Sequence, residues 1–138
     1  IKKTIGAVVE RPIDIAMMAK GRNLYTGLPE SFEITASEVF EAVSEPAVMI
    51  CEAIRSVLSR TDPDLVADIN KEGIYLTGGG SLIYGMNRLI ADYTGTSVHM
   101  LEDPTHSVVR GAAEALKHPS MLKNINYQLR SIKELTFE

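Results

Sequence analysis

Several residue types that define common protein classes are scarce in this sequence. Its 138 residues include one cysteine and no tryptophan, which excludes a disulfide framework and any zinc site built from several cysteines. The longest apolar run, residues 46–51, ends at Glu52 and is far shorter than the ~18 residues that a membrane span needs. Lysine and arginine number 14 against 18 acidic residues, so no excess of positive charge indicates a nucleic-acid partner. The single cysteine favours a reducing compartment.

What is present is the composition of a folded domain. Hydrophobic residues make up 45% of the chain and charged residues 23%, so one domain of ordinary size can bury a core that offsets chain entropy. The chain opens with residues 1–6 (IKKTIG) and no initiator methionine, which is typical of the last turn of a helix that a glycine ends. Because so short a helix does not form alone in water, we expect a fragment of a longer protein; a processed N-terminus or omitted residues are the alternatives.

The first quarter of the chain predicts a small antiparallel sheet. Strand patterns occupy residues 11–20, 24–28 and 31–35, and glycine and proline separate them. Connections this short do not join parallel strands. We therefore expect about three antiparallel strands that need another element to pack on.

The rest of the chain predicts alternating helices and strands. Thr35 and Glu38 have the spacing of a capping box, which begins a helix running to about Thr61. Strand patterns over residues 74–77 and 97–101 alternate with helical patterns over 65–70, 82–93 and 103–117. This order favours a parallel α/β layer. A last helical pattern over residues 121–132 is expected to dock on the domain, with a partner-binding or membrane-surface helix as the alternative.

The strongest local signal for a ligand is a triple glycine between a predicted strand and a predicted helix. Gly78, Gly79 and Gly80 carry no side chain, so another group can approach their backbone closely. Ser81 stands at the expected start of the helix, where free N–H groups and the helix dipole attract anions. The pattern is neither a Walker A loop nor GxGxxG, and a tight turn that binds nothing is an equal alternative.

No pattern in the sequence predicts a catalytic or a metal-binding residue. His99, His106 and His118 lack the spacing of metal ligands. Cys51 lies on the apolar side of its predicted helix, which indicates a buried structural thiol. Ser81 has no evident base partner and is predicted to be a helix N-cap rather than a nucleophile.

Five motifs in a fixed order identify a family. They are residues 1–6 (IKKTIG), 21–29 (GRNLYTGLP), 38–46 (EVFEAVSEP), 74–82 (IYLTGGGSL) and 102–111 (EDPTHSVVRG). This ordered set, spread over residues 1–117, resembles the MreB-type proteins, the bacterial actin-like cytoskeletal ATPases of rod-shaped cells. The triple glycine alone would be a weak match, whereas the whole set is specific.

The resemblance implies an α/β fold that is the C-terminal part of an actin-like (ribonuclease H-like) ATPase. Residues 1–36 would form a small outer subdomain, a short antiparallel sheet. Residues 37–138 would form the lower α/β subdomain with the adenosine motif and a C-terminal helix. Residues 118–138 extend beyond the family's usual short tail.

The resemblance also implies a nucleotide site for ATP. The residues carried over to it are Gly78, Gly79, Gly80, Ser81, Ile1 and Lys2. The glycines and the serine would hold the nucleotide through backbone N–H groups, and the two opening residues would be half of an adenine-side contact. The residues that bind Mg and position water would lie outside this chain, so the full-length protein would be an ATPase and this chain alone inactive.

The family polymerises into filaments on the inner membrane and directs cell shape and cell-wall synthesis. The implied partners are therefore other copies of the protein, cell-wall synthesis and morphogenesis proteins, and the inner membrane surface through a part outside this chain. The implied location is the cytoplasm, in membrane-associated filaments. The alternative from another class is a stand-alone protein-interaction module in which the glycine turn is purely structural.

Overall fold

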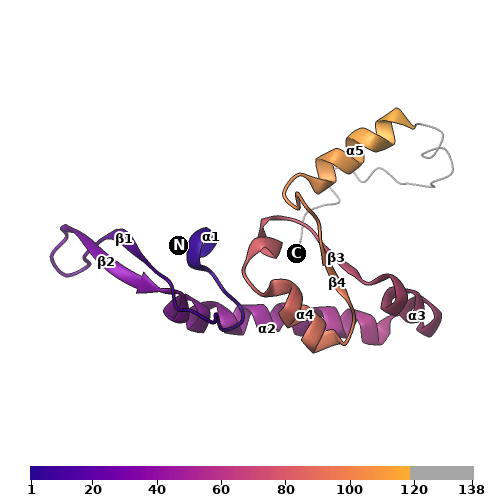
Figure 1. Cartoon of the computed structure of the whole chain (residues 1–138), viewed down its shortest axis with the longest axis horizontal. Coiled ribbons are helices and arrows are strands. Elements are labelled where there is room, and N and C mark those ends of the chain that lie inside the picture. The colour runs from indigo at the N-terminus through magenta and orange to yellow at the C-terminus, as the bar shows by residue number, and fades with distance from the viewer. Residues whose placement is uncertain (119–138) are drawn as a thin grey trace, which may run out of the picture. The chain divides into compact units, whose positions relative to one another are not determined.

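The structure, a computed structural model (Figure 1), describes residues 1–118. These residues divide into two units between Thr105 and His106. The first unit, Ile1–Thr105, contains every element except α5 (Ser107–Lys117), which belongs to the second. The helical pattern over residues 121–132 lies outside the described residues. Within the described part of the chain, no helix combines the length and apolar character that crossing a bilayer requires.

The predicted small sheet is a two-stranded hairpin. β1 (Ala16–Arg22) pairs with β2 (Pro29–Thr35) in antiparallel register, with Ala16 opposite Thr35 and Arg22 opposite Pro29. The strand predicted over residues 24–28 is wrong, because these residues form the turn of the hairpin. Residues 11–15 also lie before β1, where the Ile15 carbonyl accepts a hydrogen bond from the Ala36 N–H (2.8 Å).

Asn23 is the physical reason for the missing third strand. Its side-chain oxygen accepts hydrogen bonds from the backbone N–H groups of Tyr25 (2.8 Å) and Thr26 (3.1 Å). Its backbone carbonyl accepts a third from the N–H of Gly27 (2.8 Å), which has a φ of +72°. An asparagine that bonds to its own following backbone offers these groups a turn in place of a strand ladder.

The longest helix begins where the capping box predicts it. α2 (Ala36–Arg60) is preceded by Thr35, whose hydroxyl accepts a hydrogen bond from the Glu38 N–H (3.2 Å). The Thr35 N–H in turn donates to the Glu38 carboxylate (2.8 Å). The helix continues through Pro46. Two terminal N–H groups are thereby satisfied, which fixes the start of the element.

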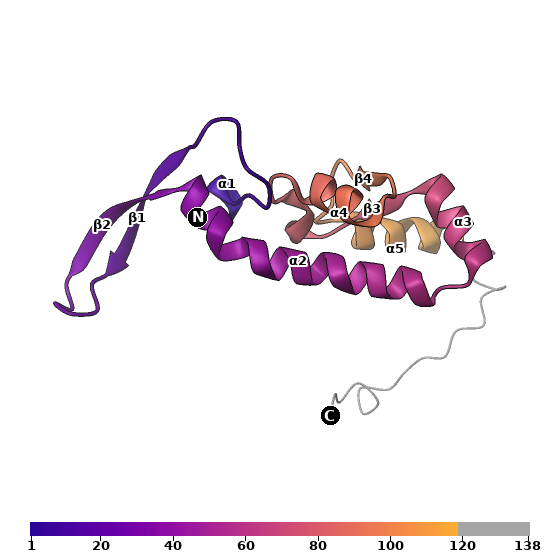
Figure 2. The same cartoon turned by 90° about the horizontal axis from the view of Figure 1, so that it is seen from below.

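The predicted parallel α/β layer is confirmed. β3 (Ile74–Leu76) pairs in parallel with β4 (Val98–Met100), with Ile74 opposite Val98. Between them in sequence lies α4 (Met86–Thr94), and before them α3 (Pro63–Glu72), which is capped by Asp62. Figure 2 shows α4 and the two strands beside the C-terminal half of α2.

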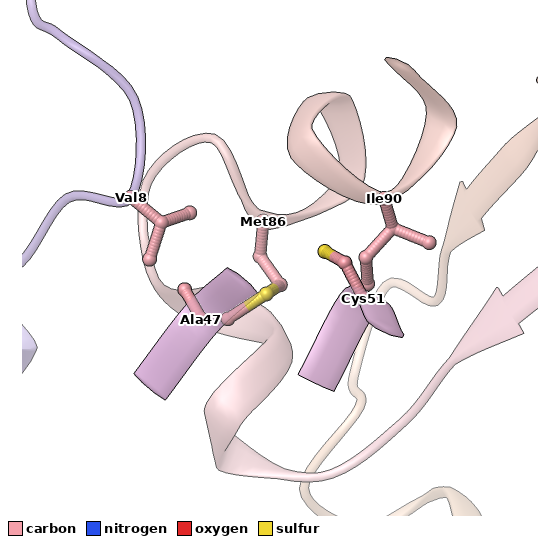
Figure 3. Packing of buried hydrophobic residues seen from close by; sticks show 5 residues of the cluster. All are labelled: Val8, Ala47, Cys51, Met86 and Ile90. Carbon is pink, nitrogen blue, oxygen red and sulfur yellow. The ribbon is translucent and has the colours of Figure 1, made fainter. Parts of the chain in front are cut away.

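The core of the first unit joins three separate segments. A cluster of buried side chains comes from the N-terminal segment, α2 and α4 (Figure 3). Its members are Val8, Ala47, Cys51, Met86 and Ile90. Cys51 and Ile90 are at most 1% exposed. The predicted burial of the Cys51 thiol is therefore confirmed.

The helix predicted to begin at residue 82 begins later. A short 3₁₀ turn, η1 (Gly79–Leu82), follows the glycines, and α4 starts only at Met86 after Gly85, which has a φ of +84°. Tyr84 is taken out of the helix because it pairs with Ala7 in an isolated parallel bridge. A tertiary contact therefore overrides the local helical pattern.

We expect Cys51 to resist alkylation in the native protein. Its side chain is 0% exposed, and burial raises the pKa of the Cys51 thiol, so the reactive thiolate is both scarce and inaccessible. Iodoacetamide at pH 8 followed by mass spectrometry should label Cys51 only after denaturation. Because the unfolded thiol ionises at lower pH than the buried one, the free energy of unfolding should fall as pH rises above the ordinary thiol pKa. Rapid native labelling would contradict this burial.

Candidate functional site

The start of the chain lies against the loop that follows the triple glycine. α1 (Lys2–Ile5) ends at Gly6, whose carbonyl accepts a hydrogen bond from the Tyr84 N–H (3.3 Å). The Tyr84 carbonyl accepts another from the Val8 N–H (2.9 Å). These bonds hold two segments together that are far apart in the sequence. They bring the lysines of α1 to the glycine turn.

A cavity of about 380 Å³ opens between α1 and the glycine turn. Its walls are Lys2, Lys3, Gly79, Gly80, Leu82, Ile83 and Thr105. The charged lining side chains are two exposed lysines, and none of these seven residues is acidic. Leu82 is 57% exposed and offers an apolar surface beside them. The cavity therefore combines positive charge with an apolar wall, which suits an anionic ligand that also carries a flat, weakly polar group.

The backbone conformation requires glycine at only one of the three positions of the turn. Gly78 has a φ of +80°, a conformation that only glycine adopts without strain. Gly79 and Gly80 do not have a positive φ. A Cβ at Gly80 would meet no atom within 4 Å, and one at Gly79 would meet only the Thr105 methyl group at 3.9 Å. Neither backbone strain nor internal packing therefore demands glycine at these two positions, and the space in front of them is open.

Two backbone N–H groups of the glycine turn are left without an acceptor in the described part of the chain. The Gly78 N–H donates to the Pro104 carbonyl (2.6 Å), and the Ser81 N–H donates to the Gly78 carbonyl (3.3 Å). In the part of the chain that the structure describes, the N–H groups of Gly79 and Gly80 donate to no backbone or side-chain acceptor. Unpaired N–H groups at the start of a helical turn are suited to bind an anionic or carbonyl oxygen.

Ser81 has a different role from the predicted one. It lies inside η1 rather than at the cap of an α-helix, and its side chain is buried. Its hydroxyl donates to the Gly78 carbonyl at 2.6 Å. The prediction of a helix N-cap is therefore wrong, because the helix itself starts later. Ser81 instead holds the turn at Gly78 that presents Gly79 and Gly80 to the cavity.

The structure brings some of the predicted site residues together and leaves others apart. Lys2, Gly79 and Gly80 line the cavity. Gly78 and Ser81 support the turn and are not among the residues that line the cavity. Ile1 is not a wall of the cavity; its carbonyl accepts hydrogen bonds from the N–H groups at the C-terminal side of α1. The nucleotide role of all six stays a prediction.

Four lining residues were not predicted from the sequence. Lys3 follows Lys2 directly, and Leu82 and Ile83 continue the glycine motif, so position next to a predicted site residue was the available signal. Thr105 comes from the turn before α5 and reaches the cavity through tertiary structure alone. Over residues 1–118, no group of three or more potential metal ligands is found together.

Comparison with known proteins finds one family that this chain matches. The model of the MreB/Mbl protein family matches residues 1–124. The cell shape-determining protein MreB of Escherichia coli K12 is 37% identical over 117 residues, which are 85% of this chain and 34% of that protein. The cell shape-determining protein Mbl of Bacillus cereus is 36% identical over 118 residues, 86% of this chain and 35% of that protein. The chain thus spans about a third of the length of these relatives.

Two solved structures of one protein superpose closely on this chain. MreB5 of Spiroplasma citri bound to ADP superposes with a TM-score of 0.81 at 26% identity, over 90% of this chain and 38% of that one. The same protein bound to AMPPNP gives a TM-score of 0.79 at 27% identity, over 89% and 36%. The expected actin-like α/β fold is therefore confirmed. With the family model covering all of the described residues and the motifs in order, this chain belongs to the MreB/Mbl family of cell shape-determining, actin-like proteins.

Proposed function

We propose that this chain forms one wall of an ATP site in a bacterial cytoskeletal filament protein. The observation that carries the proposal is the open space at Gly79 and Gly80, with two unpaired N–H groups and two lysines on the same cavity. The nucleotides bound to MreB5 of Spiroplasma citri, ADP and AMPPNP, support the choice of ligand.

The residues of the cavity have distinct proposed roles. The N–H groups of Gly79 and Gly80 would bind oxygen atoms of the nucleotide, and Gly78 and Ser81 would hold the turn that presents them. Lys2 and Lys3 would bind the anionic part or the base edge from the opposite wall, with Ile1 as the start of their helix. Leu82 and Ile83 would pack on an apolar face of the ligand and exclude water from it.

The residues of this cavity bind and orient and do not carry out hydrolysis. Within residues 1–118 no carboxylate lines the cavity, so we propose that Mg and the groups that position water come from another part of the full-length protein. ATP hydrolysis is accordingly proposed for that protein and not for this chain. We also propose that residues 1–36 and 37–138 act as the outer and lower subdomains of its nucleotide-binding half.

At the level of the cell, we propose that the full-length protein self-associates into cytoplasmic filaments at the inner membrane. These filaments would direct cell shape together with cell-wall synthesis proteins. The relatives are named cell shape-determining proteins, and this name supports the proposal. A stand-alone interaction module with a purely structural glycine turn is disfavoured, because Gly79 and Gly80 have no structural reason to be glycine.

The substitution Gly80→Leu in the full-length gene product tests the nucleotide site. A Cβ at Gly80 would meet no atom within 4 Å and Gly80 has no positive φ, so the leucine side chain starts in the open space in front of the turn. We expect ATP affinity to fall by about 10-fold or more with little change in thermal stability. Calorimetric titration with ATP and ADP measures the affinity.

The matched control for this test is Gly111→Leu. Gly111 also has no atom within 4 Å of an added Cβ and has no positive φ, but it lies in α5 and not on the cavity. We expect its nucleotide affinity to match that of the wild type. An unchanged affinity in Gly80→Leu would instead favour the interaction module and refute the site.

A further inference from the structure

One charged side chain in the segment between α1 and β1 lies over an aromatic ring. The guanidinium carbon of Arg11 is 4.2 Å from the centroid of the Tyr84 ring, which is within the range of a cation–π contact. Tyr84 belongs to the loop between η1 and α4, and its backbone already pairs with Ala7 in the isolated parallel bridge. Arg11 therefore adds a side-chain contact between two segments that are far apart in the sequence.

The same guanidinium bonds to the backbone at the end of α1. Arg11 Nη2 donates to the Gly6 carbonyl (3.3 Å), which also accepts from the Tyr84 N–H (3.3 Å). A planar guanidinium can lie on a ring and donate hydrogen bonds from its edge at once, which the compact ammonium of lysine cannot do. We call these three residues, Gly6, Arg11 and Tyr84, the Arg11 clasp.

Acidic side chains near Arg11 do not pair with it. Glu10, Asp14 and Glu41 line a cavity of about 370 Å³ together with Arg11. Over residues 1–118, however, no ion pair joins Arg11 to a carboxylate, and the buried Nε of Arg11 has no hydrogen-bond partner. Asp14 instead accepts from the Ser37 N–H (3.1 Å). A guanidinium that is partly removed from water and not neutralised by an acid is attracted more strongly to a ring.

The positive neighbours of Arg11 oppose the contact and so do not explain it. Lys3 and Arg88 line a cavity of about 510 Å³ together with Arg11 and Tyr84. Arg88 has its own partner, because its Nε lies 3.8 Å from the Asp92 carboxylate. Like charges repel, so the Tyr84 ring and the Gly6 carbonyl are the attractive partners that hold Arg11 in place.

The Arg11 clasp is directly connected to the nucleotide cavity of the proposed function. Tyr84 follows Ile83, which is a wall of that cavity, and Gly6 ends α1, which carries the two lysines of the opposite wall. Ile5 of α1 is buried against the start of α2. That contact joins α1 to α2 and not to the glycine turn, whereas the clasp joins α1 to the loop that continues the turn.

We propose that Arg11 is a positioning residue of the nucleotide cavity. Its guanidinium, held on the Tyr84 ring, keeps the lysines of α1 across the cavity from Gly79 and Gly80. This inference rests on the proposed function, because it assigns the assembly of the proposed ATP site to a side chain that does not line it. Loss of the contact lowers the fraction of molecules with an assembled cavity, and the apparent affinity for the nucleotide falls by that fraction.

The substitution Arg11→Met in the full-length gene product removes the charge and keeps an unbranched side chain. We expect the ATP dissociation constant, measured by calorimetric titration, to rise about 3-fold or more. Tyr84→Leu removes the ring and should give the same rise, and the Arg11→Met/Tyr84→Leu double variant should give no further rise. Tyr84→Phe keeps the ring and should bind ATP as the wild type does.

The matched control for the charge is Arg88→Met. Arg88 lines the cavity of about 510 Å³ with Arg11 but does not line the nucleotide cavity, and the ring contact of Tyr84 is with Arg11. We expect the ATP affinity of Arg88→Met to match that of the wild type. An equal loss of affinity in Arg88→Met and Arg11→Met would assign the effect to positive charge near the ligand and overturn the inference.

Hydrogen exchange of the nucleotide-free protein tests the Arg11 clasp without a ligand. The N–H groups of Val8 (2.9 Å) and Tyr84 (3.3 Å) bond across the two segments. In Arg11→Met we expect these two amides to exchange about 3-fold faster or more, because the segments separate locally, and the amides of α2 to exchange as in the wild type. Faster exchange in α2 by the same factor would make Arg11 a purely structural residue and contradict the positioning role.

The outcomes separate this inference from the proposed function. A wild-type protein without affinity for ATP and ADP would overturn the proposed nucleotide site and the inference with it. Wild-type affinity for ATP together with an unchanged dissociation constant in Arg11→Met would overturn the inference alone. Losses that multiply in the double variant would show that Arg11 and Tyr84 act independently, and this result also contradicts the clasp.

Discussion

Gly85→Ala is expected to lower the free energy of unfolding by about 2–5 kcal/mol. Gly85 has a φ of +84°, which a residue with a Cβ adopts only with strain. The added Cβ would also lie 2.1 Å from the Cγ2 of Val9 and 3.0 Å from its Cβ. A β-branched side chain cannot rotate away from such a contact. Urea denaturation of the full-length gene product, followed by circular dichroism, measures the loss.

Two control substitutions separate the backbone strain at Gly85 from the clash with Val9. Gly95 has a similar φ of +71°, but no atom lies within 4 Å of its added Cβ. Gly95→Ala should therefore cost only the backbone strain, about 1–2 kcal/mol. In the Gly85→Ala background, Val9→Ala should recover part of the loss by removing the clash. Equal free energies of unfolding for Gly85→Ala and Gly95→Ala would show that the contact with Val9 contributes nothing to the loss of stability.

The same substitution should weaken nucleotide binding. Gly85 follows Tyr84, whose backbone bonds to Gly6 and Val8 hold α1 beside the glycine turn. A displaced Val9 would shift this segment and move Lys2 away from the cavity. Gly85→Ala at a temperature where the protein is still folded should therefore reduce ATP affinity, whereas Gly95→Ala should not.

Ile90→Ala is expected to cost about 2–5 kcal/mol of stability. Ile90 is 1% exposed and belongs to the core cluster with Cys51 and Met86 (Figure 3). Removing its side chain loses buried apolar contacts and leaves a cavity between α2 and α4. Urea denaturation again measures the change.

The matched control is the same substitution at Ile50. Ile50 lies next to buried Cys51 on α2 but is 48% exposed in the first unit. Ile50→Ala should cost about 0.5 kcal/mol or less. An equally large loss at Ile50 would show that another part of the full-length protein covers this face of α2.

Elements with a local cause were predictable from the sequence. The capping box of Thr35 and Glu38 fixes the start of α2, because both partners lie within one turn of each other. The same holds for the cap of α3 at Asp62 and its end at Gly73. The parallel pairing of β3 and β4 followed from the order of helices and strands. In the two caps the decisive interactions join neighbours in the sequence, whereas the strand pairing followed from the order of the elements alone.

Predictions failed where a side chain or a distant segment competes with the pattern. Residues 24–28 have the composition of a strand, but Asn23 binds their N–H groups and folds them into a turn. Residues 82–85 continue a helical pattern, but the bridge between Ala7 and Tyr84 delays α4 to Met86. On α2 the burial of Cys51 was predicted, but Ile50 and Val57 are apolar and exposed, because burial there depends on which face α4 covers.

The candidate site was likewise predictable from the sequence only in part. The sequence by itself determined the family, through five motifs in order, and the glycine turn, because three residues without Cβ in a row are visible in the chain. Only the tertiary structure decided that Lys2 and Lys3 lie across a cavity from Gly79 and Gly80, and that Thr105 joins them. The reason is physical: the cavity depends on backbone bonds between Gly6, Val8 and Tyr84, and no local pattern encodes a contact between residues so far apart in the chain.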